Sequence, residues 1–98
     1  MINELEIILY VSDQAKSRDF YSAILGLQPV LDVPGMTEFE IHPGMKLGLM
    51  PESGIAKIIG ANLPHPSGGN GIPRCELYLL VNDAEVHYDM ALELGAKP

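Results

Sequence analysis

The sequence predicts a small α+β protein built around a duplicated strand–helix unit. The octets "EIILYVSD", which begins at Glu6, and "ELYLLVND", which begins at Glu76, share Glu, Leu, Val and Asp at their first, fourth, sixth and eighth places. An amphipathic segment that ends at a glycine follows each octet. Such internal repetition indicates a repeated supersecondary unit, and three short alternating segments between the copies add a β-meander to it.

The first copy runs from a strand into a helix. Residues 4–11 are rich in Ile, Leu and Val and too few for a helix, so we expect a strand. Asp13, or the serine before it, can accept hydrogen bonds from the free N–H groups of a first helical turn. Apolar side chains recur at helical spacing from Phe20 to Leu25. Gly26 is expected to end this helix because glycine adopts the left-handed conformation without a steric penalty.

Three short strands and a linker follow the first helix. The segments "QPVLDV", "MTEFEIH" and "MKLGLM" are predicted strands, and a Pro-Gly pair separates each from the next. Residues 51–74 are rich in glycine and proline, which predicts a linker with one helical turn at "GIAKIIG". Within a single domain of residues 1–98, the first strand–helix–meander module is therefore expected at 4–50.

The second copy begins after the linker and stops after its helix. Residues 75–81 are a predicted strand, Asp83 or the asparagine before it a cap, and "AEVHYDMALEL" an amphipathic helix that ends at Gly95. Residues 75–98 thus hold only the strand and helix of a second module. Because unpaired sheet edges are a liability, the 98 residues are either part of a longer protein, which we favour, or a second chain supplies the missing strands.

The composition excludes several classes of partner. The formal net charge is −7 and the sequence pI about 4.7, whereas nucleic acids and anionic membranes require a basic surface. The longest apolar runs fall short of the roughly 20 residues of a membrane span, and the N-terminus has no basic region of a signal peptide. A single cysteine, Cys75, cannot form an internal disulfide, so we predict a cytoplasmic protein.

Two segments carry a family resemblance. The stretch "LYVSDQAKSRDFYSAILGL" resembles the signature of the vicinal oxygen chelate (VOC) superfamily, and "LYLLVNDAEVHYDMALELGAKP" resembles the matching segment of its second module. This superfamily includes glyoxalase I, bleomycin-resistance and fosfomycin-resistance proteins and extradiol dioxygenases. The resemblance implies paired βαβββ modules whose eight strands form a cup-shaped mixed sheet, usually in a homodimer.

The resemblance also implies where a ligand binds. In metal-binding members, the first strand of each module offers a ligand seven residues before the Asp of the motif, and here Glu6 and Glu76 hold these positions. Strand alternation places two further side chains of each strand on the same face as its glutamate. The predicted ligand pocket is therefore lined by Ile8, Tyr10, Tyr78 and Leu80, with Glu6 and Glu76 as candidate catalytic and metal-binding residues.

Three interpretations of the two glutamates stay open. The favoured one is a cup of the bleomycin-resistance type that binds a small molecule without a complete metal site. An apolar pocket with two carboxylates suits a cationic or hydrogen-bonding ligand. The alternative is a metal-dependent lyase or isomerase of the glyoxalase type, in which Glu6 and Glu76 bind a divalent ion that polarises an oxygen-chelating substrate. In the third, both glutamates are solvated residues at the edge of a sheet.

Other residues bear on this choice. By the resemblance, glyoxalase-like members carry another carboxylate on the fourth strand of a module, where this chain has Gly48 or a neighbour. No cofactor is therefore certain, and whether the protein is an enzyme stays open. Two facing carboxylates repel, so one would take up a proton or a cation and could act as a general acid or base. The three histidines and Cys75 match no metal-ligand or activated-nucleophile pattern.

Overall fold

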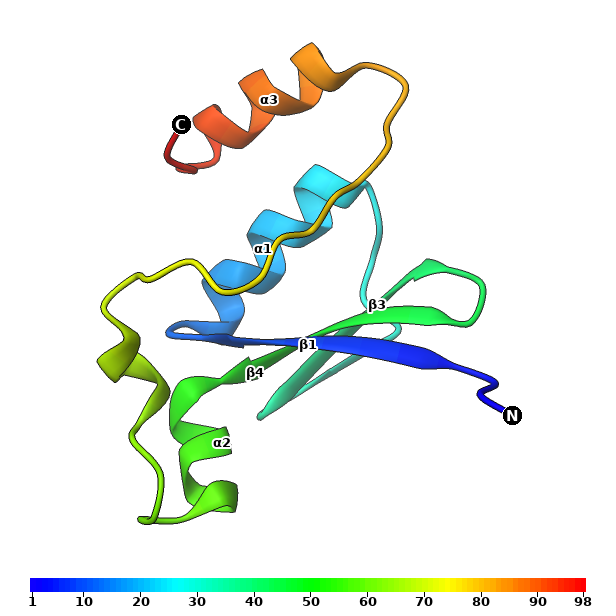
Figure 1. Ribbon diagram of the computed structural model, residues 1–98. Helices are drawn as coiled ribbons and strands as arrows, with labels where there is room; N and C mark the ends of the chain where they lie inside the picture. The colour runs from blue at the N-terminus through cyan, green and yellow to red at the C-terminus, as the bar shows by residue number, and fades with distance from the viewer. The chain divides into compact units, whose positions relative to one another are not determined.

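The computed structural model describes all of residues 1–98 (Figure 1). It forms two compact units, Met1–Gly68 and Gly69–Pro98, which are described separately. The elements of the first unit are β1 (Leu5–Val11), α1 (Gln14–Leu25), β2 (Leu31–Val33), β3 (Met36–His42), β4 (Met45–Pro51) and α2 (Glu52–Ile59). A 3-10 turn, η1 (Pro66–Gly69), includes the last three residues of the first unit and the first residue of the second. The second unit contains α3 (Ala84–Glu93).

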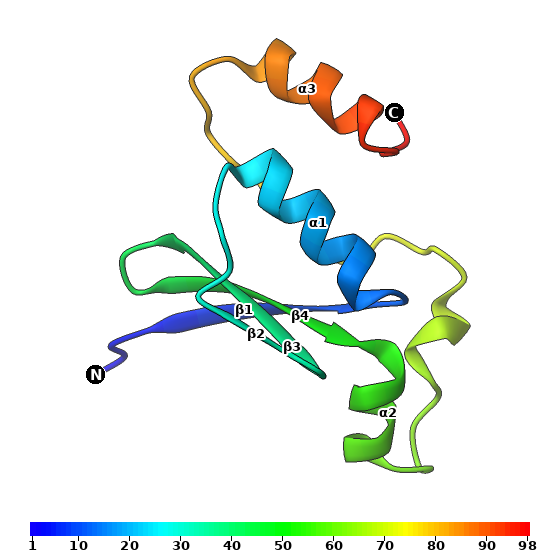
Figure 2. The same cartoon turned by 180° about the vertical axis from the view of Figure 1, so that it is seen from behind.

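The four strands form one mixed sheet in the order β1-β4-β3-β2. Strand β1 pairs with β4 in parallel, and the β2–β3 and β3–β4 pairs are antiparallel. Helix α1 connects β1 to β2 and packs on one face of the sheet, against β3 and β4 (Figure 2). Strand β1, helix α1 and strands β2 to β4 therefore form the βαβββ arrangement that the sequence predicts.

The core lies between α1 and the sheet. Phe39 of β3 and Leu47 and Leu49 of β4 are fully or almost fully buried, together with Thr37. Phe39 is the cross-strand partner of Leu47, and Thr37 that of Leu49. Because side chains alternate along a strand, the residues between them belong to the opposite face of the sheet. That opposite face is the one that carries the candidate site.

Both predicted helix caps are present. The Asp13 carboxylate accepts a hydrogen bond from the Lys16 N–H at 3.0 Å, and Gly26 ends α1 in the left-handed conformation at φ 66°. In the second unit, the Asp83 carboxylate accepts a bond from the Val86 N–H at 3.1 Å. The repeated Asp of the two octets therefore has the same structural role twice, which confirms the cap prediction.

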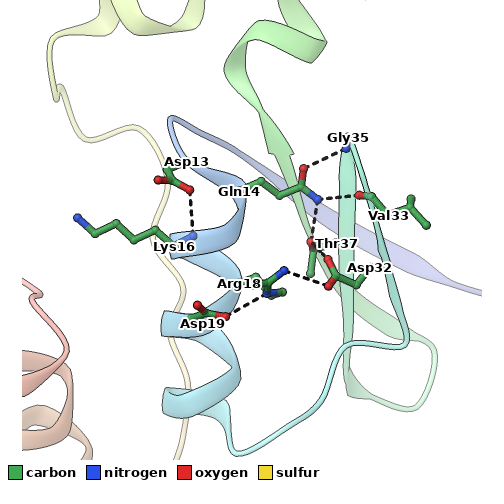
Figure 3. Close-up of polar contacts among 9 residues, drawn as sticks. All are labelled: Asp13, Gln14, Lys16, Arg18, Asp19, Asp32, Val33, Gly35 and Thr37. Carbon is green, nitrogen blue, oxygen red and sulfur yellow. Dashed lines mark hydrogen bonds and ion pairs between the residues drawn. The ribbon is translucent and has the colours of Figure 1, made fainter.

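A glutamine at the first position of α1 fastens this helix to the β2–β3 hairpin (Figure 3). The Gln14 side-chain amide donates to the Val33 carbonyl at 2.8 Å and the Thr37 hydroxyl at 2.9 Å, and its oxygen accepts the Gly35 N–H at 3.0 Å. Thr37 in turn donates to Asp32, which also binds Arg18 at 3.2 Å. One side chain thus contacts both strands and the turn between them.

Gln14→Ala is expected to lower the free energy of unfolding by about 1–3 kcal/mol, because it removes three hydrogen bonds and leaves the buried Thr37 hydroxyl with one partner fewer. Chemical denaturation followed by circular dichroism measures this change. Lys16→Ala, on the exposed side of the same helix turn, is the matched control and should stay within about 0.5 kcal/mol. Equal losses in the two variants would contradict the role given to Gln14.

The linker prediction is wrong in one respect. Where one helical turn was expected, α2 spans eight residues from Glu52 to Ile59. Burial of Ile55 against the ends of β4 and β1 stabilises it. Glu52 in its first turn and Lys57 in its last complement the helix dipole. The glycine and proline content of a segment does not indicate whether such contacts form.

Residues 75–81, predicted as a strand, pair with no other segment of the structure. A strand requires a hydrogen-bonded neighbour, and the four strands of the sheet pair only with one another. Only α3 of the repeated unit therefore has regular structure. The division into a first module, a linker and the start of a second module stays a prediction.

Candidate functional site

The face of the sheet opposite α1 carries the predicted residues of the first module. We call it the open face and define it by Glu6, Ile8 and Tyr10 of β1, Glu38 of β3, and Lys46 and Gly48 of β4. Cross-strand register joins these positions: Glu6 is opposite Lys46, Ile8 opposite Gly48, and Gly48 opposite Glu38. Ile8 and Tyr10 are 40% and 49% exposed. Apolar surface and charged groups are thus side by side on this face.

Two carboxyl groups meet on the open face. The side chains of Glu6 of β1 and Glu38 of β3 interact although β4 lies between their strands, and a side-chain hydrogen bond with Glu38 is the largest cause of the raised Glu6 pKa. Glu6 bends over β4 at Gly48, where a Cβ atom would lie only 3.0 Å from the Glu6 Oε2 and 3.2 Å from the Ile8 Cγ1. The absence of a side chain at Gly48 therefore leaves the space that the Glu6 carboxyl occupies.

The environment of Glu6 favours its protonated form. Its pKa is raised from 4.5 to about 7, first by the hydrogen bond with Glu38, then by burial and by the negative charge of Glu38. The positive charge of Lys46 lowers the Glu6 pKa, and the negative charge of Glu4 raises it. Near neutral pH, Glu6 is therefore divided between its protonated and charged forms, a property of groups that accept and release protons in binding and catalysis.

The structure places the predicted site residues in two groups. Glu6, Ile8 and Tyr10 share the open face of the first unit, as strand alternation predicts. The other three belong to the second unit, where Glu76 is exposed and Tyr78 and Leu80 are 80% and 87% exposed. The pairing of Glu6 with Glu76 across a cup stays a prediction. The carboxyl group that does contact Glu6 belongs to Glu38.

Glu38 was missed as a site residue although its signal was present. The alternation of "MTEFEIH" places Glu38 and Glu40 on the polar face of their strand. Choosing between them requires the register of β3 against β4, which is interrupted by an irregularity between Glu40 and His42. Only this register puts Glu38 opposite Gly48. Gly48, where the superfamily resemblance implies a carboxylate ligand, is therefore opposite the carboxylate-bearing Glu38.

No group of three or more His, Cys, Asp or Glu side chains in the structure is arranged to hold a metal ion. The open face offers two carboxyl groups, and carboxylate oxygens suit hard ions such as Mg²⁺. A Mg²⁺ ion held by two carboxylates takes its remaining ligands from water or substrate. A metal ion on this face would need further ligands from outside the first module.

Two shallow pockets of the first unit lie elsewhere. One, of about 320 Å³, is lined by Gln14 and Arg18 among others. The other, of about 490 Å³, is lined by residues that include Lys57 of α2 and His65. Neither is lined by a residue of the open face. No helix of the structure has the length and apolar character that crossing a membrane requires.

The β1-α1-β2-β3-β4 order is that of the βαβββ module which the sequence resemblance implies. The family model of the Glyoxalase/Bleomycin resistance protein/Dioxygenase superfamily matches residues 2–92, and the chain belongs to this superfamily. No curated protein matches the sequence. Among solved structures, protein ATC0852 from Agrobacterium tumefaciens, determined by solution NMR, is 42% identical with a TM-score of 0.44. That match covers 48% of this chain and 38% of ATC0852.

Proposed function

We propose that the protein binds a small molecule on the open face, with a cationic or hydrogen-bond-donating group of the ligand against the Glu6–Glu38 pair. The observation that carries this proposal is a hydrogen-bonded carboxyl pair set beside the exposed side chains of Ile8 and Tyr10. Ligand pockets combine apolar lining with a few convergent polar groups in this way. Membership of a superfamily that includes the bleomycin-resistance proteins supports the same proposal.

The chemistry of the pair suits an amine. An ammonium group donates to carboxylate oxygens in charge-assisted hydrogen bonds, which are stronger than neutral ones, and it can also interact with the face of the Tyr10 ring. Such a ligand would take the place of the proton that Glu6 holds. Its affinity should therefore increase as the pH rises through about 7.

The cup needs a second half, which we propose comes from the second unit and from a second copy of the chain. Leu31 and Val33 of β2, like Ile8 and Tyr10, are exposed apolar side chains. Apolar surface of this kind supports contact with a partner surface. The residues of the second unit in such a cup would be Glu76, Tyr78 and Leu80. Sedimentation equilibrium of the purified protein tests the homodimer, and a monomer at micromolar concentration would contradict it.

The second candidate function is the metal-dependent lyase or isomerase. It is favoured by the same pair, because a divalent cation would relieve the repulsion between the two carboxylates. Glu76 would supply a third carboxylate, and a bound ion would polarise a substrate oxygen. In this function Glu6 would hold the ion as an ionised carboxylate, because a bound cation favours the charged form. For either function we propose the cytoplasm, whose reducing conditions suit the free, exposed Cys75.

A matched pair of ligands tests the binding proposal. Phenethylamine, a cation with an apolar body, should bind the wild type more tightly than neutral phenethyl alcohol in calorimetric titrations at pH 8. Glu38→Gln should weaken amine binding by roughly 10- to 100-fold, the range expected when a hydrogen bond to a charged group is lost. Glu40→Gln, on the exposed part of the same strand, is the control and should leave it unchanged.

Equal affinity for the amine and the alcohol, or no effect of Glu38→Gln, would contradict the proposal. Titration with Mn²⁺ separates the second function from the first. Stoichiometric Mn²⁺ binding that a Glu6→Ala, Glu76→Ala double variant abolishes would favour the metal-dependent enzyme. It would also justify assays of lyase and isomerase activity on the metal-loaded protein.

A further inference from the structure

The Glu6 and Glu38 carboxyl groups can meet only where the strand between them has a residue without a side chain. In the sheet order, β4 separates β1 from β3, so the backbones of Glu6 and Glu38 are about 9–10 Å apart in the pairing direction. Two glutamates can meet at that separation only if their side chains lean over the middle strand. The middle strand has no side chain at Gly48, directly opposite Glu38.

The backbone does not explain this glycine. Gly48 is not among the glycines with positive φ, so another residue could adopt its conformation. Glycine inside a strand weakens the strand, and it commonly marks a place that another group approaches closely. At Gly48 the approaching groups are the side chains of Glu6 and Ile8. A Cβ atom at position 48 would lie 3.0 Å from the Glu6 Oε2, 3.4 Å from the Glu6 Cδ and 3.2 Å from the Ile8 Cγ1.

We infer that Gly48 is a positioning residue that allows Glu6 to reach Glu38, and that Glu38 supplies from β3 a carboxylate that position 48 of β4 lacks. The inference rests on the proposed function in so far as this pair is the polar centre of the binding face. It assigns to Glu38 and Gly48 a joint role that neither strand predicts alone. The contact thus requires one residue on each of three strands: a glutamate on β1, a glycine on β4 and a glutamate on β3.

The other charged groups near the pair do not replace this arrangement. Lys46 is opposite Glu6 in the register and its charge favours the ionised carboxylate, yet the hydrogen bond of Glu6 is with Glu38. Glu4 contributes repulsion alone. Glu40, opposite Lys46, is exposed. The contact therefore depends on the space over Gly48 and not on a nearby cation.

A double-mutant cycle tests the role of Gly48. Gly48→Ala should reduce the folded-to-unfolded ratio severalfold in the Glu6 background, and less in a Glu6→Ala background, because the Glu6 carboxyl is then gone and only the Ile8 Cγ1 crowds the added Cβ. Gly68→Ala is the matched control, since its φ is not positive and its Cβ would meet no atom within 4 Å. If Gly48→Ala alone does not fold while the Glu6→Ala, Gly48→Ala variant does, the coupling is shown directly.

An NMR measurement tests the contact itself, independently of any ligand. Side-chain NOEs between the γ protons of Glu6 and Glu38 are expected in the wild type and in Gly68→Ala, and they should be lost in Gly48→Ala. Additive effects in the cycle, or NOEs that persist in Gly48→Ala, would overturn the inference. The amine titration reports separately on the proposed function. Loss of the NOEs in a protein that never bound the amine would refute that function and leave the role of Gly48 established.

Discussion

Phe39→Ala is expected to remove a large share of the stability of the protein. Phe39 is 0% exposed and lies between α1 and the sheet, opposite Leu47. Truncation of a buried phenylalanine costs about 3–5 kcal/mol, because burial energy is lost and a cavity remains. Proteins of this size have total stabilities of about 5–15 kcal/mol. We therefore expect a melting temperature lower by well over 10 °C, measured by circular dichroism and by urea denaturation.

The control for this prediction is a large apolar residue outside the core. Ile58 of α2 is 72% exposed, and Ile58→Ala should change the free energy of unfolding by less than about 0.5 kcal/mol. A loss below about 1 kcal/mol in Phe39→Ala would show that the face of the sheet under α1 is not the core. The location of the open face, and with it the candidate site, would then be wrong.

The fold of the first module was accessible from the sequence because its signals are local. A strand of Ile, Leu and Val, a capping Asp13 and a terminating Gly26 each act within a few residues, and the structure shows both helix-end contacts. The superfamily signature lies over the same segment and is confirmed by the match to residues 2–92. Helix α2 was underestimated because part of its stability comes from the burial of Ile55 against β4 and β1, which the composition of the segment does not indicate.

The candidate site was only half predictable because it depends on cross-strand register. Glu6 was found because the superfamily resemblance implies a ligand seven residues before Asp13, a relation that lies within one segment of the chain. Glu38 becomes a site residue only when β3 is aligned on β4 so that it faces Gly48. No pattern within the β3 segment distinguishes Glu38 from Glu40, since both have the same alternation. The pairing of Glu6 with Glu76 stays a prediction, and the partner of Glu6 in the first unit is Glu38.

The stability of the protein should depend on pH through Glu6. Its pKa is about 7 in the folded protein against an ordinary value of 4.5, so between these values the folded state binds more protons than the unfolded state. Stability from this group is then fully present below about pH 4.5 and is lost as the pH rises through 7. The physical reason is that the shared proton is replaced by repulsion between Glu6 and Glu38.

Glu6→Gln should remove this dependence. The glutamine amide can donate to the Glu38 carboxylate at every pH, so the variant should melt near the wild-type temperature at pH 5 and clearly above it at pH 8. Glu40→Gln removes an exposed carboxylate of the same strand and should give a curve parallel to that of the wild type. If the difference between Glu6→Gln and the wild type were the same at pH 5 and pH 8, Glu6 would not share a proton with Glu38. The binding face would then carry two independent negative charges, and amine affinity should no longer vary near pH 7.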